Sequence, residues 1–117
     1  MKLARGEVWL AKAAAPERTR AESNREALEA ALAARPVLVV SPPEFNDHLR
    51  TVIVVPISRD RASAPFRPAF RLDGERTVAL VDQVRTIERS RLVRRVGKLS
   101  SITLRNVLET LRLAFEP

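Results

Sequence analysis

The residues best placed to do chemistry are one arginine and one hydroxyl at the edges of two apolar stretches. Arg35 stands directly before the stretch PVLVVSP, and Ser58 ends the stretch VIVVPIS, two residues after Pro56. Proline donates no hydrogen bond to a β-ladder, so we expect the second stretch to stop pairing near Pro56. A guanidinium and a hydroxyl at the ends of neighbouring strands can hold a phosphodiester between them. We therefore predict a phosphate-binding site at this place.

Other kinds of catalytic group are scarce in this sequence. The chain has no cysteine and a single histidine, His48, which argues against disulfides, thiolate chemistry, zinc-thiolate sites and histidine clusters. His48 falls in a turn-rich segment, where it is either a proton carrier or an ordinary surface residue. We expect the chain to use no metal and no other cofactor.

The composition indicates one basic domain. The 117 residues, 45% of them hydrophobic, suffice for one core but are few enough to favour a dimer. Lys and Arg outnumber Asp and Glu by 21 to 14, and all but three of the 21 are arginine, which grips phosphate in a bidentate manner. The net charge of +7 favours nucleic acid as a partner, although coding bias can also enrich a surface in arginine. The sequence shows no long apolar run and no secretory signal, which predicts a cytoplasmic protein.

Short β-strands must position these residues. Residues 6–12 (GEVWLAK) alternate in polarity, which predicts a strand with Val8 and Leu10 on its buried face and Trp9 on an amphipathic face. Further strands are predicted within residues 35–42, 52–58, 66–72, 77–81 and 83–88. The first two of these should pair antiparallel across a turn rich in proline, and Pro68 confines residues 66–72 to a sheet edge.

Two helices complete the predicted fold. Ser23 and Glu26 form a capping box, which predicts a short helix over residues 23–34, inserted in the first loop. Ser100 is a good N-cap for a C-terminal helix over the segment SITLRNVLETLRLAF. Its apolar face is predicted to consist of Leu104, Val107, Leu108, Leu111 and Phe115. The predicted class is mainly β with helices, an α+β domain.

Taken in order, these motifs resemble a known family. The series GEVWL, RPVLVVSP with Asn46 after it, VIVVPIS, APFR, VALVDQVRTI and a closing GKLS helix is similar to the MazF/PemK toxins of type II toxin–antitoxin systems. The resemblance covers nearly the whole chain and implies a single domain over residues 1–117, folded as a small SH3-like barrel. It further implies a homodimer that cuts single-stranded mRNA at specific sequences without a metal, inhibits translation and growth, and is silenced by an antitoxin with a disordered segment.

The resemblance assigns catalysis to two positions. Arg35 lies in the RP motif, where we expect it to stabilise the charge on the reacting phosphate; general-base duty suits it less, because arginine keeps its proton at neutral pH. The alternative is that Arg35 only caps a strand end. Ser58 stands where relatives carry threonine and keeps the hydroxyl. The implied reaction is attack by the RNA's own 2′-hydroxyl, which leaves a 2′,3′-cyclic phosphate and a 5′-hydroxyl.

Four further residues are predicted to bind RNA: Asn46, Arg59, Gln83 and Arg85. Asn46 is alternatively a turn former, and Gln83 with Asp82 alternatively ends a strand and satisfies backbone groups. Arg85 begins a basic run that extends to Lys98. This run either attracts RNA or the acidic tail of an antitoxin, or is only a solvated face.

The first loop departs from the family pattern. Relatives carry a run like Gly-Ser-Glu-Gln there, whereas this chain has PERTRAE and the inserted segment 23–34, which is either a lid or an antitoxin contact. Two other functions therefore stay open. One is a module on the same barrel that binds RNA or antitoxin with weakened or lost catalysis. The other is a gyrase poison of the related CcdB fold, which the RP and PIS motifs do not favour.

Overall fold

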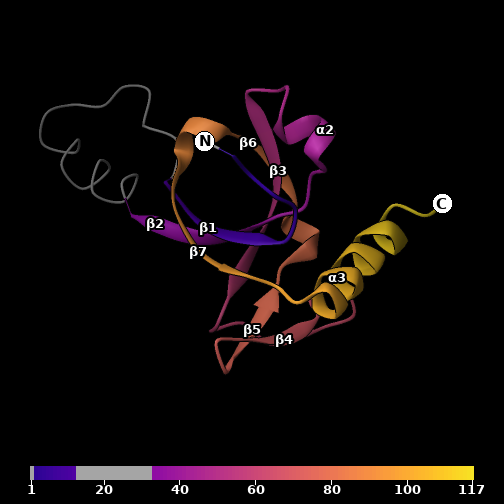
Figure 1. The fold of residues 1–117 in the computed structure, drawn as a ribbon. Helices are drawn as coiled ribbons and strands as arrows, with labels where there is room; N and C mark the ends of the chain where they lie inside the picture. Colours follow the sequence, from indigo (N-terminus) through magenta and orange to yellow (C-terminus); the bar gives the residue numbers. More distant parts are fainter. Residues whose placement is uncertain (1, 13–32) are drawn as a thin grey trace, which may run out of the picture.

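A strongly curled β-sheet and one long helix make up the computed structural model, which describes residues 2–12 and 33–117 (Figure 1). The strands of this part are β1 (Glu7–Lys12), β2 (Ala34–Val39), β3 (Thr51–Ser58), β4 (Ala69–Leu72), β5 (Glu75–Ala79), β6 (Arg85–Glu88) and β7 (Leu92–Lys98). The helices are α2 (Pro43–Asn46), α3 (Ser101–Ala114) and the single 3₁₀ turns η1 (Val81–Gln83) and η2 (Arg89–Arg91). The mainly β class with a C-terminal helix is confirmed.

The sheet runs in the order β4-β5-β3-β2-β1-β7, and β6 pairs with β3. β2 and β3 are antiparallel neighbours, as predicted, and β4 lies at an edge, where Pro68 was expected to confine it. The β4–β5 hairpin closes through Asp73 and Gly74, which both have positive φ (53° and 80°), as a two-residue hairpin turn requires. β3 is the central strand, because it pairs with β2, β5 and β6.

Pairing of β3 continues beyond Pro56, so the prediction that it would stop there was wrong. Pro56 lies opposite Val37 of β2, and its carbonyl accepts a hydrogen bond from the Leu80 N–H at 2.8 Å. Ile57 and Ser58 then pair with β5. Proline lacks a donor but keeps its acceptor, so the strand can change partners at this residue. Ser58 is consequently held inside a ladder.

Both faces of the curled sheet are buried. One face packs against α3, and its core comprises Val8, Leu38, Val40, Val55, Ile57, Leu72, Ala79, Val81, Leu99 and Val107. The other face carries Leu3, Trp9, Ala11, Val37, Val39, Val52, Val54, Ile87 and Leu92. The prediction of an amphipathic face on β1 was therefore wrong: Trp9 is only 7% exposed, whereas Leu10 is half-buried. Curling of the sheet places Leu3 and Leu92 in the same cluster as the indole.

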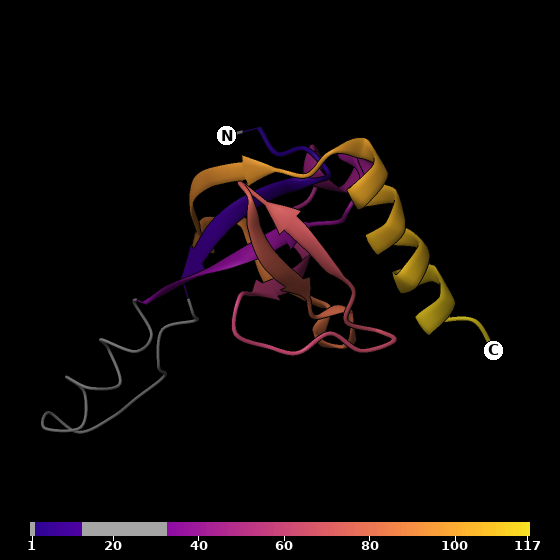
Figure 2. The ribbon, with the colours of Figure 1, turned by 90° about the horizontal axis from the view of Figure 1, so that it is seen from below.

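α3 lies along one side of the sheet (Figure 2). The Ser100 hydroxyl accepts a hydrogen bond from the Thr103 N–H at 3.2 Å, which confirms the predicted N-cap. The predicted apolar face is confirmed at Leu104, Val107, Leu108 and Leu111, which pack on the core. Phe115 was wrongly included: it is 73% exposed, because the helix ends at Ala114 and Phe115 is the C-cap.

Three other segments also need comparison with the prediction. The inserted helix predicted at residues 23–34 lies outside the described residues except for its last two, of which Ala33 is in no helix and Ala34 begins β2. The turn-rich segment after β2 contains the one-turn helix α2. β7 was not predicted as a strand, because two register shifts against β1 break its alternation of polar and apolar residues. Among the described helices, none is long and apolar enough to cross a membrane.

Candidate functional site

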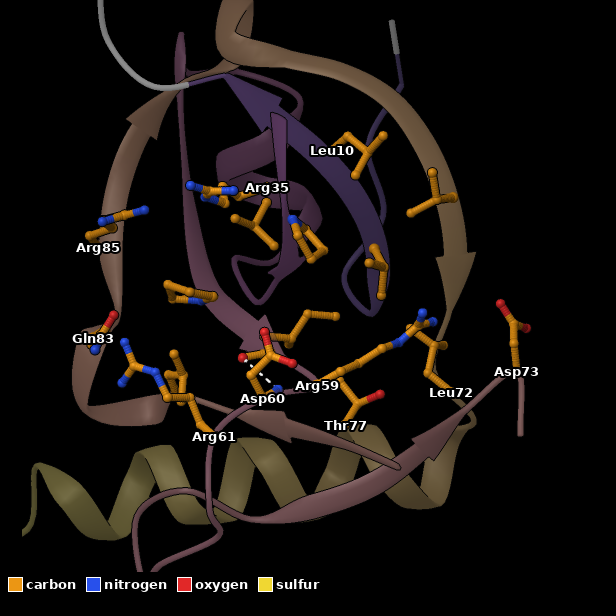
Figure 3. A pocket seen from close by; sticks show the side chains of 18 residues that line it. Leu10, Arg35, Arg59, Asp60, Arg61, Leu72, Asp73, Thr77, Gln83 and Arg85 are labelled. Atoms are coloured by element: carbon orange, nitrogen blue, oxygen red, sulfur yellow. Dashed lines mark hydrogen bonds between the residues drawn. The ribbon is translucent and has the colours of Figure 1, made fainter. Parts of the chain in front are cut away.

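A cavity of about 750 Å³ opens inside the curl of the sheet (Figure 3). Its apolar lining comes chiefly from β1, β2, β3, β4 and β7 and includes Val8, Leu10, Val37, Ile57, Leu72 and Val96. Its polar and charged lining consists of Arg35, Ser58, Arg59, Asp60, Arg61, Asp73, Thr77, Gln83 and Arg85. Five of the six predicted site residues therefore line one cavity, and Asn46 does not.

Arg35 and Ser58 flank this cavity because β2 and β3 separate there. The last pair of the β2–β3 ladder is Val37 with Pro56, and the same register extended by two residues would set Arg35 opposite Ser58. β2 instead continues along β1, where Arg35 pairs with Ala11, and β3 continues along β5. The two side chains thus face the gap between diverging strands.

The Ser58 hydroxyl has a defined position. Its Oγ accepts a hydrogen bond from the Asp60 N–H at 3.1 Å (Figure 3), and this leaves the hydroxyl proton for another acceptor. A phosphate oxygen in the cavity is an acceptor of the required kind. Arg35 is exposed and extends into the same space from β2, where its five N–H donors suit a phosphate.

Positive charge dominates the lining. Four arginines, two of them on the segment directly after β3, face two aspartates. Arg59 forms an ion pair with Glu75 at 3.0 Å, but both side chains are more than half exposed, so this pair is weak and can yield to an anion. A concave surface with excess arginine concentrates polyanions by its electrostatic field.

The loop after β3 is tied to η1 by Arg67 and Asp82. The guanidinium donates from Nε and Nη2 to the two carboxylate oxygens, each at 2.8 Å. These hydrogen bonds hold the pKa of Asp82 below its usual value and raise the pKa of Arg67. Asp82 is absent from the cavity lining, and its described contact positions the loop that carries Arg59 and Arg61 beside Gln83.

Asn46 lies outside this cavity and is completely buried. Its side-chain oxygen accepts from the Ser41 hydroxyl at 2.6 Å, and its amide nitrogen donates to the Ser41 carbonyl at 2.9 Å. The Ser41 hydroxyl in turn accepts from the Ile53 N–H at 3.1 Å. A buried amide with these partners presents no surface to a ligand, so the placement favours the turn-forming alternative.

The basic residues from Arg85 to Lys98 lie in different surroundings. Arg85 lines the cavity, whereas Arg91 donates from Nε to the Lys12 carbonyl at 2.6 Å and so ties η2 to the end of β1. Arg94 and Lys98 are exposed. The run is therefore not one continuous binding face.

Arg95 of the same run contacts the buried carboxylate of Glu7 at 3.2 Å. Glu7 is 8% exposed and also accepts from the Trp9 indole N–H at 3.0 Å and the Ala4 N–H at 3.1 Å. Burial alone would raise the pKa of Glu7, but the three hydrogen bonds and the charge of Arg95 outweigh it and lower the pKa below its usual value. This cluster stabilises β1 against β7.

Sequence reasoning missed Asp60, Arg61, Asp73 and Thr77 as polar lining residues. The string RDR after Ser58 was a usable signal, since two arginines one residue apart follow directly on a predicted site residue. Thr77 gave none, because its place depends on the pairing of β5. In the described ranges, no three His, Asp or Glu side chains gather as metal ligands would.

Comparison with known proteins places the chain. Residues 4–115 match the model of the PemK-like, MazF-like toxins of type II toxin–antitoxin systems. A mycobacterial endoribonuclease solved with its cognate antitoxin is similar at a TM-score of 0.73 and 19% identity, with 98% of each chain covered. MazF from Deinococcus radiodurans is similar at a TM-score of 0.70 and 20% identity, with 97% of this chain and 96% of that chain covered. The Mycobacterium tuberculosis toxin MazF-mt6 is similar at a TM-score of 0.67 and 21% identity, with 93% of this chain and 95% of that chain covered.

The structural likenesses at these identities establish the fold, and the family model covers all but the ends of the chain. The chain therefore belongs to the PemK-like, MazF-like toxins of type II toxin–antitoxin systems.

Proposed function

We propose that this toxin is a sequence-specific endoribonuclease that cuts single-stranded mRNA without a metal and so inhibits translation and growth. The observation that carries the proposal is the convergence of Arg35 and Ser58 on one basic cavity. The description of one structural relative as an endoribonuclease supports the same assignment. The cavity is wide enough for a flipped nucleotide and its phosphate, because pockets of a few hundred Å³ or more accommodate ligands of that size.

In the proposed reaction, RNA supplies its own nucleophile. The 2′-hydroxyl gives its proton to water as its oxygen bonds to the adjacent phosphorus, the bond to the 5′-oxygen breaks, and the leaving oxygen takes up a proton from water. Arg35 stabilises the growing negative charge on the phosphoryl oxygens, and the Ser58 hydroxyl donates to one of them. Arg59, Gln83 and Arg85 hold the flanking nucleotides. A DNA strand has no 2′-hydroxyl and is not cut.

The partners proposed are an identical subunit and an antitoxin. Relatives of the same fold were solved with a cognate antitoxin and as a MazE–MazF complex, which supports the second assignment. A disordered acidic segment of the antitoxin would fold on this basic surface and compete with RNA, with an affinity that weakens as salt rises.

The test is cleavage of a mixed-sequence single-stranded RNA and its DNA copy by the purified chain in EDTA, with the product ends mapped. Cuts in RNA alone, at a short recurring sequence and with cyclic phosphate ends, are expected. Arg35→Ala should lower the rate by about 100-fold or more, because it removes a donor to the developing charge. Arg105→Ala removes an exposed arginine from α3 and serves as the control. Full activity of Arg35→Ala contradicts the mechanism, and intact RNA that still binds selects the non-catalytic binding module.

A further inference from the structure

We propose a second RNA-binding site at the other end of β3 and β6, where Lys2 and Arg50 hold a backbone phosphate of the strand that enters the first cavity and His48 stacks on an unpaired base. The inference rests on the proposed RNA substrate and extends it. In Figure 1, α2 and the beginning of β3 lie at the end of the sheet opposite β4 and β5. A second cavity, of about 500 Å³, opens there.

The lining of the second cavity is mostly charged. It consists of Lys2, Asp47, His48, Leu49, Arg50 and Arg89, together with Asn46, which is fully buried and offers no exposed side-chain surface. The lining thus contains three cationic side chains and one carboxylate, that of Asp47. Three of the lining residues, Lys2, His48 and Arg50, are exposed. The Arg89 N–H donates to the Arg50 carbonyl at 2.8 Å, which fixes the backbone that carries Arg50. An exposed arginine on a fixed backbone suits a phosphate contact, because most protein hydrogen bonds to nucleic acid go to phosphate oxygens and sugars.

The two cavities are connected by rigid structure. Arg85, in the first cavity, pairs with Val54 of β3, and Arg50 precedes Thr51, which pairs with Glu88. Four residue steps along the chain, from Val54 back to Arg50, therefore separate the level of Arg85 from Arg50, a span of about 13 Å at the usual rise per residue. Within the described sheet, β6 has no partner strand besides β3, and its residues Arg85, Thr86 and Glu88 are exposed. A single strand that leaves the first cavity along β6 reaches the second.

The chemistry of the lining favours RNA over a protein segment. Among the described residues that line the second cavity, Leu49 is the sole aliphatic one. An acidic, amphipathic antitoxin segment needs an apolar groove for its anchors, and this cavity offers none. A polyanionic backbone needs cations, and an imidazole such as that of His48 can stack on an unpaired base.

The experiment compares binding of two RNA strands to the full chain. Both strands carry 2′-O-methyl groups, which block the attacking oxygen; one has about 20 nucleotides and the other about 6, the lower range that a small β-barrel covers. The test variant is Lys2→Gln/Arg50→Gln, and His48→Ala is made separately. The matched control is Lys98→Gln/Arg105→Gln, which also removes one exposed lysine and one exposed arginine, neither of which lines either cavity.

A loss of two phosphate contacts should weaken binding of the long strand by about 25-fold at about 0.1 M salt and reduce the slope of log affinity against log salt by about 1.4. Binding of the short strand should change no more than in the control. An equal loss for both strands, or a loss no greater than in the control, overturns the second site. A matched loss for poly-glutamate also overturns it, because the site then takes acidic protein segments.

These outcomes are distinct from failure of the proposed function. Cleavage is measured on natural RNA and fails or succeeds with Arg35→Ala, whereas this measurement reports only affinity. Absence of any RNA binding by the unmodified chain overturns both proposals.

Discussion

Replacement of Asn46 by alanine tests whether this buried amide stabilises the fold or contacts RNA. The substitution removes the acceptor of the Ser41 hydroxyl and the donor to the Ser41 carbonyl. Ser41 is only 1% exposed, so water does not replace either partner. Each orphaned buried group costs about 1 to 3 kcal/mol, and the variant should lose about 2 to 6 kcal/mol of unfolding free energy. Small domains have about 5 to 15 kcal/mol in total, so the loss is large.

Urea unfolding followed by Trp9 fluorescence measures this loss, since the indole lies in the buried core. The midpoint should fall by more than about 1 M at an unchanged slope. Asn106→Ala removes an exposed amide from α3 and should stay within about 0.5 kcal/mol. The Ser41→Ala/Asn46→Ala double variant should lose less unfolding free energy than the sum of the two single-variant losses, because the two residues share one set of hydrogen bonds. A cost for Asn46→Ala below about 1 kcal/mol, or strict additivity, refutes the reasoning.

Three further predictions concern single residues. Gly6→Ala should cost about 1 kcal/mol more than Gly74→Ala in thermal unfolding. Both glycines have positive φ, but a Cβ at Gly6 would lie 2.9 Å from Leu104 Cδ2, so that this side chain, which packs against the core, must shift, whereas nothing lies within 4 Å of one at Gly74. The pKa of Glu7 lies lower in the folded chain than its ordinary 4.5, so its stabilisation is complete above that value and is lost as the pH falls through the folded value. Unfolding free energy measured against pH should therefore fall less steeply in acid for Glu7→Gln than for the natural chain, and equal slopes argue against the carboxylate cluster. Ser58→Ala should slow RNA cleavage by about 100-fold while Ser58→Thr retains it, because only the second keeps the hydroxyl; equal rates would exclude the hydroxyl from the reaction.

The fold was predictable where apolar patterns are local. The stretches around Arg35 and Ser58 predicted β2 and β3, and the Ser100 cap predicted the beginning of α3. β7 was not predictable, since register shifts against β1 interrupt its pattern and an apolar residue, Val93, is exposed beside Arg94 and Arg95. Burial of Trp9 was not predictable either, because it depends on the curl of the whole sheet.

The candidate site followed from the sequence only in part. Arg59 and Arg85 could be proposed from their place beside strand ends, and the structure puts both in the cavity with Gln83. Thr77 and Arg61 line it because of tertiary pairing and loop folding, which one sequence does not encode in any short pattern. Asn46 was assigned to RNA by resemblance in sequence order, although order along a chain says nothing about burial.

β2 separates from β3 at Pro36, which has no backbone N–H to donate. Bonded and non-bonded pairs alternate in an antiparallel ladder, and the Val40 N–H donates to the Ile53 carbonyl at 3.0 Å. Counting from that pair, the next bonded position after Val37 and Pro56 would join residue 36 to Ile57, where proline has no N–H to give. Any other residue at position 36 would have a backbone N–H, which would allow β2 and β3 to pair for one further bonded position. In this toxin, the proline of the RP motif therefore works as a spacer: it keeps open the gap into which its neighbouring arginine points.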